Sequence, residues 1–404
     1  MQVRQEIFDT YWRFATMRQE VFFNKINNVP PPWTSDPIIN TYKFCNAYRA
    51  SDRVSQYLIK NVIYDEKRSK NEEEVILRIL LFKIFNKIET WEYLENKIGD
   101  YITLSNFDSN LYSNILQEAM NLGYVIYTSA YMSCASKEFG YDKKHQNHLA
   151  LIDKMVAQDR VVNCIVKAKK FEDVFQIIQG YPLLGKFMAY QLATDINYSE
   201  IINFDENSFT IAGPGAERGI SKCFIDTDGK TYTDIIHWMT ENQEREFQRL
   251  GLNFQSLWGR PLQAIDCQNL FCETDKYCRA AFPDLKSNRK KIKSKFTSTP
   301  QSIDYFYPPK WQLNDKIQEK VGHKLPKSDF ASLQQINNSY QQLSLELDST
   351  VKATSLIIEN GSKAYKTSDE ESQFKHKSKR SKALQNTQIE KFQQLCLFES
   401  NWVS

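Results

Sequence analysis

A glycine-bounded turn between two apolar segments is the stretch of this chain best suited to hold a phosphate group. It runs from Gly180 to Gly185 and is followed directly by Lys186. Apolar residues recur at helical spacing over 171–179 and 187–196, which predicts a helix, a tight turn and a second helix. The N-terminus of the second helix would present unpaired backbone N–H groups, with the lysine charge beside them. The alternative is an ordinary helical hairpin without a ligand.

Four polar residues farther toward the N-terminus have the spacing of one helical face. Arg49, Asp52, Arg53 and Gln56 stand at positions i, i+3, i+4 and i+7. On a helix such residues lie side by side and can interact with one another. They indicate either a solvated, salt-bridged face or the wall of a pocket.

A third group of polar residues lies in a predicted helix over 262–277. Asp266, Asn269 and Glu273 share one face of it. Asp266 is a candidate catalytic carboxylate, with a capping or network role as the alternative. The cysteines between 267 and 278 lack the Cys-x-x-Cys spacing and the fourth ligand of an iron–sulfur cluster. His145 and His148 have no accompanying ligands, so we expect two exposed histidines, no metal and no cofactor.

Gly213 and Gly215 flank a proline in a second tight turn, which begins another predicted helix. This helix N-terminus is a second candidate phosphate site, and Arg218 and Lys222 one turn apart could reach the backbone of a bound strand. The turn lacks the Gly-Lys-Ser/Thr of a P-loop, so the chain carries no kinase motif of its own.

Composition limits the partners and the compartment. The 404 residues carry a net charge of only +3, so a nucleic-acid surface must come from local clustering. One basic run, 286–295, contains Lys290 and Lys291 and predicts either phosphate contacts or a solvated loop. No apolar run is long enough for a membrane span and the N-terminus has no signal-peptide core, so we expect a cytoplasmic protein with reduced thiols.

The composition also predicts two regions. Residues 1–317 read as a mainly α-helical domain. Residues 318–404 are polar, and we expect a linker or tail that ends in a short amphipathic helix over 386–402. That last helix could contact a partner.

The hairpin resembles the helix-hairpin-helix of the DNA glycosylase superfamily. The matching residues are Tyr181 to Ala189, with Leu183 at the position of the first hairpin glycine. In that superfamily the catalytic aspartate follows the second glycine by about twenty residues, which the resemblance places at Asp205. The Schiff-base lysine of bifunctional members is replaced by Phe187, which implies an enzyme without lyase activity.

Four further motifs resemble one branch of this superfamily. They are Trp33 to Pro37, the stretch from Phe44 to Val54, Gly213 to Gly215, and Ile265 to Leu270. The branch is the α-glutamyl/putrescinyl thymine pyrophosphorylase-like group, which includes the helical domain of 5-hydroxymethyluracil DNA kinases and Brig-type antiphage glycosylases. The resemblance covers roughly residues 8–315, and it implies that the domain over 1–317 is DNA glycosylase-like and catalytic.

From these features we expect a monofunctional DNA N-glycosylase. It would flip a modified pyrimidine, such as a hypermodified phage base, out of DNA and hydrolyse its base–sugar bond with Asp205, leaving an abasic site in antiphage defence. The pocket for the base is predicted from Asn46 together with Arg49, Asp52, Arg53 and Gln56. The first alternative is a base-hypermodification enzyme that displaces pyrophosphate from a 5-pyrophosphorylmethyl pyrimidine with an amine or amino acid. The second is a non-catalytic DNA-binding module.

Overall fold

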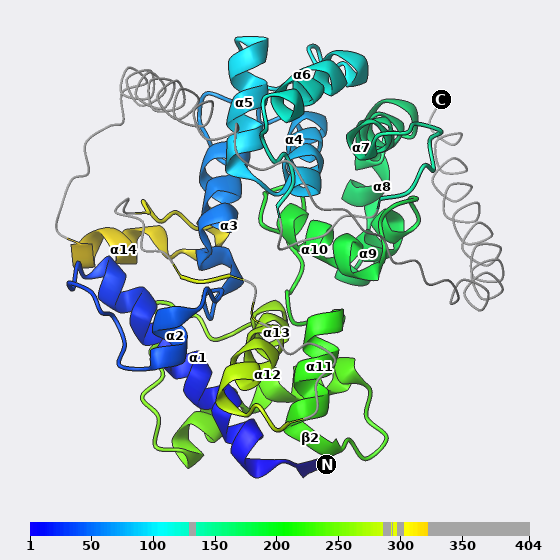
Figure 1. Ribbon diagram of the computed structural model, residues 1–404. Coiled ribbons are helices and arrows are strands. Elements are labelled where there is room, and N and C mark those ends of the chain that lie inside the picture. Colours follow the sequence, from blue (N-terminus) through cyan, green and yellow to red (C-terminus); the bar gives the residue numbers. More distant parts are fainter. Residues whose placement is uncertain (129–134, 286–291, 293, 297–302, 322–404) are drawn as a thin grey trace, which may run out of the picture. The chain divides into compact units, whose positions relative to one another are not determined.

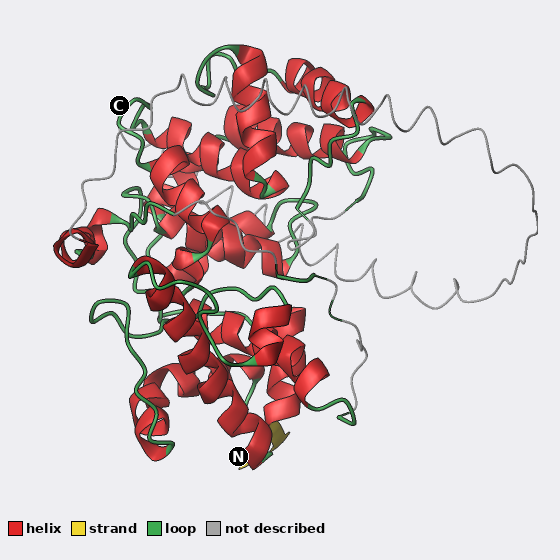
Figure 2. Ribbon diagram, turned by 60° about the vertical axis from the view of Figure 1, so that its left-hand side comes forward, coloured by secondary structure: helices red, strands yellow, loops and turns green. Residues whose placement is uncertain are grey.

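The computed structural model describes residues 1–128, 135–285, 292, 294–296 and 303–321. Helices dominate this part of the chain, and two short strands form an antiparallel pair (Figure 2). The fold is therefore mainly α, as the helical periodicity predicts. The strands are β1, Gln2–Val3, and β2, Phe224–Asp226. None of the helices in the described ranges is both long and apolar enough to cross a membrane.

One group of helices combines the first two helices of the chain with three helices that follow residue 213 (Figure 1). The long helix α13 lies at its centre and contacts α1, α2, α11 and α12. The bounds of these helices are α1 Gln5–Ile26, α2 Pro37–Thr41, α11 Pro214–Cys223, α12 Tyr232–Arg249 and α13 Ala264–Ala281. Aromatic side chains of α1 fill the core here, because Tyr11, Trp12 and Phe14 are fully buried.

A second group is continuous in sequence and contains α4 to α10. Its helices are α4 Glu72–Phe85, α5 Ile88–Ile98, α6 Ser109–Asn121, α7 Lys144–Asp153, α8 Val162–Lys167, α9 Phe171–Gln179 and α10 Lys186–Asn197. The helix α4 is buried on all sides, which explains why its sequence is apolar all round. It contacts α5, α7, α8 and α10.

Several short elements lie between α2 and α4 or elsewhere in the described chain. They are a 3-10 turn, Arg49–Ser51, the helix α3, Arg53–Tyr57, and a π-helical turn, Leu58–Ile63. A second π-helical turn, Lys154–Gln158, extends α7, and a 3-10 turn, Pro309–Trp311, precedes α14, Asn314–Val321. The turn at Arg49–Ser51 contacts α13, so it joins the segment after α2 to the centre of the first group.

Close packing around α11 explains three glycines. A Cβ added to Gly219 would lie 2.1 Å from the backbone oxygen of Phe271 in α13, so this position requires glycine. A Cβ at Gly215 would lie 2.7 Å from Cys272 Sγ in α13, and one at Gly213 would lie 2.6 Å from the ring of Phe187 in α10. At these two positions a neighbouring side chain would have to move.

The long apolar stretch over 71–96 forms two helices, α4 and α5, rather than one. Asn86 adopts a left-handed conformation with φ of 47° and ends α4. Asparagine tolerates this conformation better than most residues, and it serves as the C-terminal cap. The predicted division into residues 1–317 and 318–404 stays a prediction, and the amphipathic helix expected near the C-terminus lies outside the described residues.

Candidate functional site

The predicted hairpin is present as α9, a short turn and α10, and the two helices contact each other. Leu183 in the turn has φ of 66°, the left-handed region that glycine adopts without steric cost. This is the position at which the hairpin motif carries glycine. At this one position the backbone thus has a conformation that glycine commonly adopts, although the side chain is leucine.

The N-terminus of α10 is exposed and lacks a capping side chain within the described part of the protein. Gly185 is the N-cap residue, and both it and Lys186 are exposed. A Cβ added to Gly185 would meet nothing within 4 Å, so packing does not require glycine there. The first N–H groups of the helix thus face outward, where an anion could accept hydrogen bonds from them.

The side chain of Arg49 is buried in an ionic network rather than placed on an open face. Its guanidinium contacts Asp195 Oδ1 at 2.6 Å, and Lys83 Nζ lies 3.0 Å from Asp195 Oδ2. Arg49 also donates to Gln191 Oε1 at 2.9 Å and to the Tyr198 hydroxyl at 3.0 Å. Burial lowers the pKa of Lys83 to about 8, against the opposing effect of Asp195. This network joins α4 and α10 to the Arg49–Ser51 turn.

The other residues predicted to share a face with Arg49 point elsewhere. The segment is not one helix, because Asp52 is the extended N-cap residue between the 3-10 turn and α3. Asp52 accepts a hydrogen bond from the Asn46 backbone at 2.8 Å, while Asn46 Nδ2 donates to Ser51 O. Arg53 is exposed and lies 3.5 Å from Glu89.

Gln56, the last of the four residues, is buried and bonded to the backbone. Its side chain donates to Ala50 O at 2.7 Å and accepts from the Phe306 backbone at 2.8 Å. The prediction that these polar groups form one continuous helical face is therefore wrong, since a break at Asp52 turns them in different directions. Their role in a base pocket stays a prediction.

Asp205, the predicted catalytic residue, lies on the exposed loop between α10 and α11. Its carboxylate accepts a hydrogen bond from the Asn207 backbone at 2.9 Å, which closes a local turn. The neighbouring Glu206 is instead buried and pairs with Arg260 at 2.6 Å. The buried carboxylate in this loop is thus Glu206 and not Asp205, the residue predicted from the sequence.

Glu206 lies close enough to Asp266 for the two carboxylates to influence each other. Asp266 accepts hydrogen bonds from the backbones of Arg49 at 2.7 Å and Gln263 at 3.0 Å. Burial, assisted by the charge of Glu206, raises the pKa of Asp266 to about 7. Burial also raises the pKa of Glu206, although the charge of Arg260 opposes this. The pair can therefore hold or accept a proton near neutral pH.

Cations and an aromatic ring surround Glu206. Arg260 stacks on Trp311, with its guanidinium carbon 3.9 Å from the ring centroid. Lys310 donates to Ser199 O at 2.7 Å and Ile202 O at 2.8 Å, and burial lowers its pKa. We call Glu206, Asp266, Arg260, Lys310 and Trp311 the Glu206 cluster. It combines a titratable carboxylate pair with positive charge, which suits proton transfer beside an anionic group.

The second predicted DNA-binding helix, α11, is largely occupied by its own packing. Lys222 is buried, with its ammonium 2.7 Å from Asp275 Oδ1, so the prediction that it contacts DNA is wrong. Arg218 also pairs with Asp275, at 3.1 Å, but is partly exposed. Gly213 and Gly215 have a packing role, described above, and a DNA contact by them stays a prediction.

Several other sequence predictions have different outcomes. Lys290 and Lys291 lie outside the described residues. His145 and His148 are both buried rather than exposed, and the Tyr127 hydroxyl lies 2.8 Å from His148 Nδ1. Asp266 has the network role that was its alternative, while the raised pKa keeps it a candidate for proton transfer.

Sequence reasoning missed Lys83, Asp195, Glu206, Arg260 and Lys310. One of these carried a clear signal, because Lys83 is the single charge within an otherwise apolar stretch at the end of α4. Asp195 is the single charge between Phe187 and Asn197 in α10, but polar residues stand beside it. A charge in such a place is paired if it is buried. The other three come from separate loops, and only the fold brings them together.

Comparison with known proteins identifies relatives. A family described as "5-hmdU DNA kinase, helical domain" matches residues 5–287. A protein of Bacillus phage SP10 named 5-hmdU DNA kinase is 25% identical over 291 residues, which cover 68% of this chain and 45% of the relative. The chain thus spans less than half the length of that curated relative. No solved structure matches the chain.

These relatives correct one prediction. The phage protein is named for a kinase, which is a transferase, whereas we expected a hydrolase that cleaves N-glycosyl bonds. The assignment as a DNA N-glycosylase is therefore wrong. The hairpin resemblance that suggested it describes local geometry, which unrelated chemistries can share.

Proposed function

Because the chain belongs to the family of the 5-hmdU DNA kinase helical domain, we propose that it binds DNA and performs a group transfer on a modified pyrimidine. The reaction is the displacement of pyrophosphate from a 5-pyrophosphorylmethyl pyrimidine by an amine or amino acid. The observation that carries this proposal is the Glu206 cluster, where a titratable carboxylate pair lies beside Arg260.

DNA would be held at the N-terminus of α10. Its first backbone N–H groups are uncapped by any described side chain, and Gly185 leaves space for close approach. The exposed ammonium of Lys186 adds a charge beside them. Contacts of this kind hold the phosphate backbone without reading its sequence. The target base must leave the stack before protein groups can act on it.

The chemistry assigns one role to each part of the cluster. The amine nitrogen forms a bond to the 5-methylene carbon, and the carbon–oxygen bond breaks with its electron pair going to pyrophosphate. The carboxylate of Glu206, coupled to Asp266, accepts the proton that the amine loses. The guanidinium of Arg260, with Lys310 nearby, stabilises negative charge on the departing pyrophosphate. Trp311 holds the guanidinium by stacking.

Transfer activity tests this proposal directly. Duplex DNA with a 5-pyrophosphorylmethyl pyrimidine is incubated with an amine, and pyrophosphate release is followed. Glu206→Gln is expected to lower the rate by about 100-fold or more, as loss of a general base does. Asp205→Asn, one residue away, is expected to retain most of the rate. No release by the native protein with any of several amines and amino acids would refute the proposal.

Glu217→Gln is the matched control. Glu217 is an exposed carboxylate on α11, and its substitution removes one negative charge without touching the cluster. Equal losses in Glu206→Gln and Glu217→Gln would indicate a general charge effect and contradict the assigned role of Glu206.

A further inference from the structure

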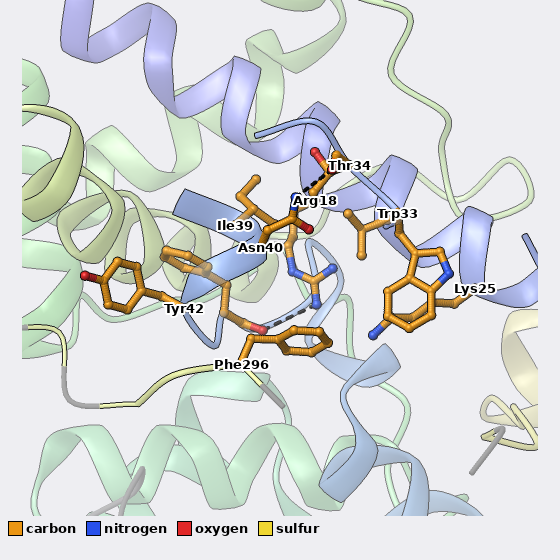
Figure 3. A pocket seen from close by; sticks show the side chains of 10 residues that line it. Arg18, Lys25, Trp33, Thr34, Ile39, Asn40, Tyr42 and Phe296 are labelled. Carbon is orange, nitrogen blue, oxygen red and sulfur yellow. Dashed lines mark hydrogen bonds between the residues drawn. The ribbon is translucent and has the colours of Figure 1, made fainter. Parts of the chain in front are cut away.

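A small hollow lies beside α1 in the first helix group, and no member of the Glu206 cluster lines it (Figure 3). It is formed by α1, the segment from Trp33 to Phe44, and the segment that carries Phe296. The latter is held in place by backbone pairing, because Phe296 N donates to Thr41 O and Lys43 N donates to Ser294 O. The lining residues are Arg18, Val21, Lys25, Trp33, Thr34, Ile39, Asn40, Tyr42, Phe44 and Phe296.

Arg18 is the main polar group in this hollow. It is 7% exposed, and its Nη2 donates to Phe44 O at 3.3 Å. Its Nη1 is buried and has no hydrogen-bond partner among the described residues. A buried guanidinium nitrogen without a partner is costly, so it indicates a binding position for an acceptor.

Lys25 adds a second cation to the same hollow. Its ammonium lies 4.5 Å from the centroid of the Trp33 ring and 5.0 Å from that of Phe296. Burial and the charge of Arg18 lower the pKa of Lys25 to about 8. The lining contains no carboxylate, and neither cation has an ion pair within the described ranges. Asp52 and Glu273 act on the charge of Arg18 from outside the lining, but no carboxylate lines the hollow itself. The lining therefore offers two cations to an entering negative charge.

The size of the hollow limits what can enter. The space available to a water-sized group is about 20 Å³, which exceeds one water but excludes a whole base. The aromatic rings of Trp33 and Phe296 lie at the hollow and offer stacking surfaces for a planar group outside it (Figure 3). A compact anion attached to a ring has this combination of properties.

We propose that this hollow binds a phosphoryl group carried by a base or nucleotide, with Arg18 and Lys25 as its donors. The phosphoryl oxygen accepts from Arg18 Nη1, and the attached ring stacks on Trp33 or Phe296. Two sources supply this chemistry: a free nucleotide and a phosphorylated modified base in DNA. Only the second source rests on the function proposed above.

Isothermal titration of the full chain with named probes tests the site. The free probes are pyrophosphate, thymidine monophosphate and thymidine, and the DNA probes are duplexes with a 5-phosphoryloxymethyl or a 5-hydroxymethyl pyrimidine. We expect thymidine monophosphate to bind at least about tenfold more tightly than thymidine. Lys25→Gln and Arg18→Met should each remove that difference, while Arg13→Met on an exposed position of α1 should keep it.

The possible outcomes test the phosphoryl site independently of the proposed group transfer. Equal binding of thymidine and its monophosphate, no binding of any phosphoryl probe, or an unchanged preference in Lys25→Gln would overturn the site. Lys25 is only half-buried, so this variant tests the site even if Arg18→Met fails to fold. Preference for the free monophosphate without preference between the two duplexes would support the site as a nucleotide site. That result would exclude a modified base in DNA as the source of the bound phosphoryl group. It would not bear on the transfer reaction, which the pyrophosphate-release assay tests separately.

Discussion

Arg49 and Arg53 differ in environment although they stand four residues apart and were both predicted to line a pocket. Arg49 is buried against Asp195, whose carboxylate also contacts Lys83, whereas Arg53 is exposed beside Glu89. Spacing alone could not separate them, because the chain leaves the helical path at Asp52. A buried charge is bound to its partners, and its removal leaves them uncompensated.

Arg49→Met is therefore expected to lower the free energy of unfolding by about 3–5 kcal/mol. Its loss leaves the buried Asp195, Gln191 and Tyr198 groups without their donor. Arg53→Met, the matched control, is expected to change stability by less than about 1 kcal/mol, because exposed pairs contribute little. Urea denaturation of both variants measures the difference. Similar losses in the two would contradict the burial of Arg49.

The carboxylate of Asp266 predicts a pH dependence of stability. Its pKa of about 7 in the fold is above the ordinary value, so the native state binds a proton that the unfolded state has released. Stability should consequently fall as pH rises from about 4 through about 7, by at most about 1.4 kcal/mol per pH unit for this group. Asp52, with a pKa of about 6, acts in the same direction, and His145, whose pKa is lowered, acts in the opposite direction.

Comparison with Asp266→Asn isolates the contribution of this carboxylate. The variant is expected to be less stable overall, since an amide cannot accept both backbone hydrogen bonds. Its stability should nevertheless fall less between about pH 4 and pH 7 than that of the native protein. Parallel curves for the two proteins would show that Asp266 does not titrate in this range.

Two glycines, one inside α11 and one at the N-cap of α10, have different surroundings. Gly219 in α11 faces the backbone of Phe271 in α13, while Gly185 before α10 faces open space. The distinction requires the partner helix, which lies about fifty residues away in sequence. Local pattern predicts the helices well but not which faces they bury.

Gly219→Ala is expected to destabilise the protein by about 1–3 kcal/mol or more, because the added carbon would overlap backbone that cannot move aside easily. Gly185→Ala should leave the melting temperature nearly unchanged. It should instead weaken DNA binding, since its Cβ projects where a phosphate would approach the helix N-terminus. Thermal unfolding and an electrophoretic mobility shift on the two variants test both parts. Normal DNA binding by Gly185→Ala would count against the proposed DNA contact.

Substitution of Lys186 tests whether its charge at the N-terminus of α10 contributes to DNA binding. Its replacement by Gln should weaken binding to all DNA sequences alike and reduce the slope of log affinity against log salt by about 1. Fluorescence anisotropy over about 50 to 200 mM salt measures this slope. Lys230→Gln, which removes an exposed lysine from the turn before α12, is the control. An equal change in slope for both would indicate charge without a specific contact.

For the protein as a whole, the sequence predicted the mainly helical fold, the hairpin and the relation to the helical domain of 5-hmdU DNA kinases, but not the assembly of the Glu206 cluster. Helical periodicity is local and survives in any context. Glu206 and Arg260 come from loops and Lys310 from the Pro309–Trp311 turn, and the helical pattern places none of them. Asp266 lies at the start of α13, where the charges of Glu206 and Arg260 act on it. The glycosylase assignment failed for a related reason, since a phosphate-binding hairpin does not specify which bond is broken.

The proposed reaction changes the 5-substituent of the pyrimidine and leaves the base attached to the sugar. Intact mass spectrometry of one defined duplex, with a single 5-pyrophosphorylmethyl pyrimidine and an added amine, distinguishes this reaction from base removal. We predict a product in which the pyrophosphoryl group is replaced by the amine, formed by the native protein and lost in Glu206→Gln. An unchanged mass with every amine, or loss of the whole base, would contradict the account.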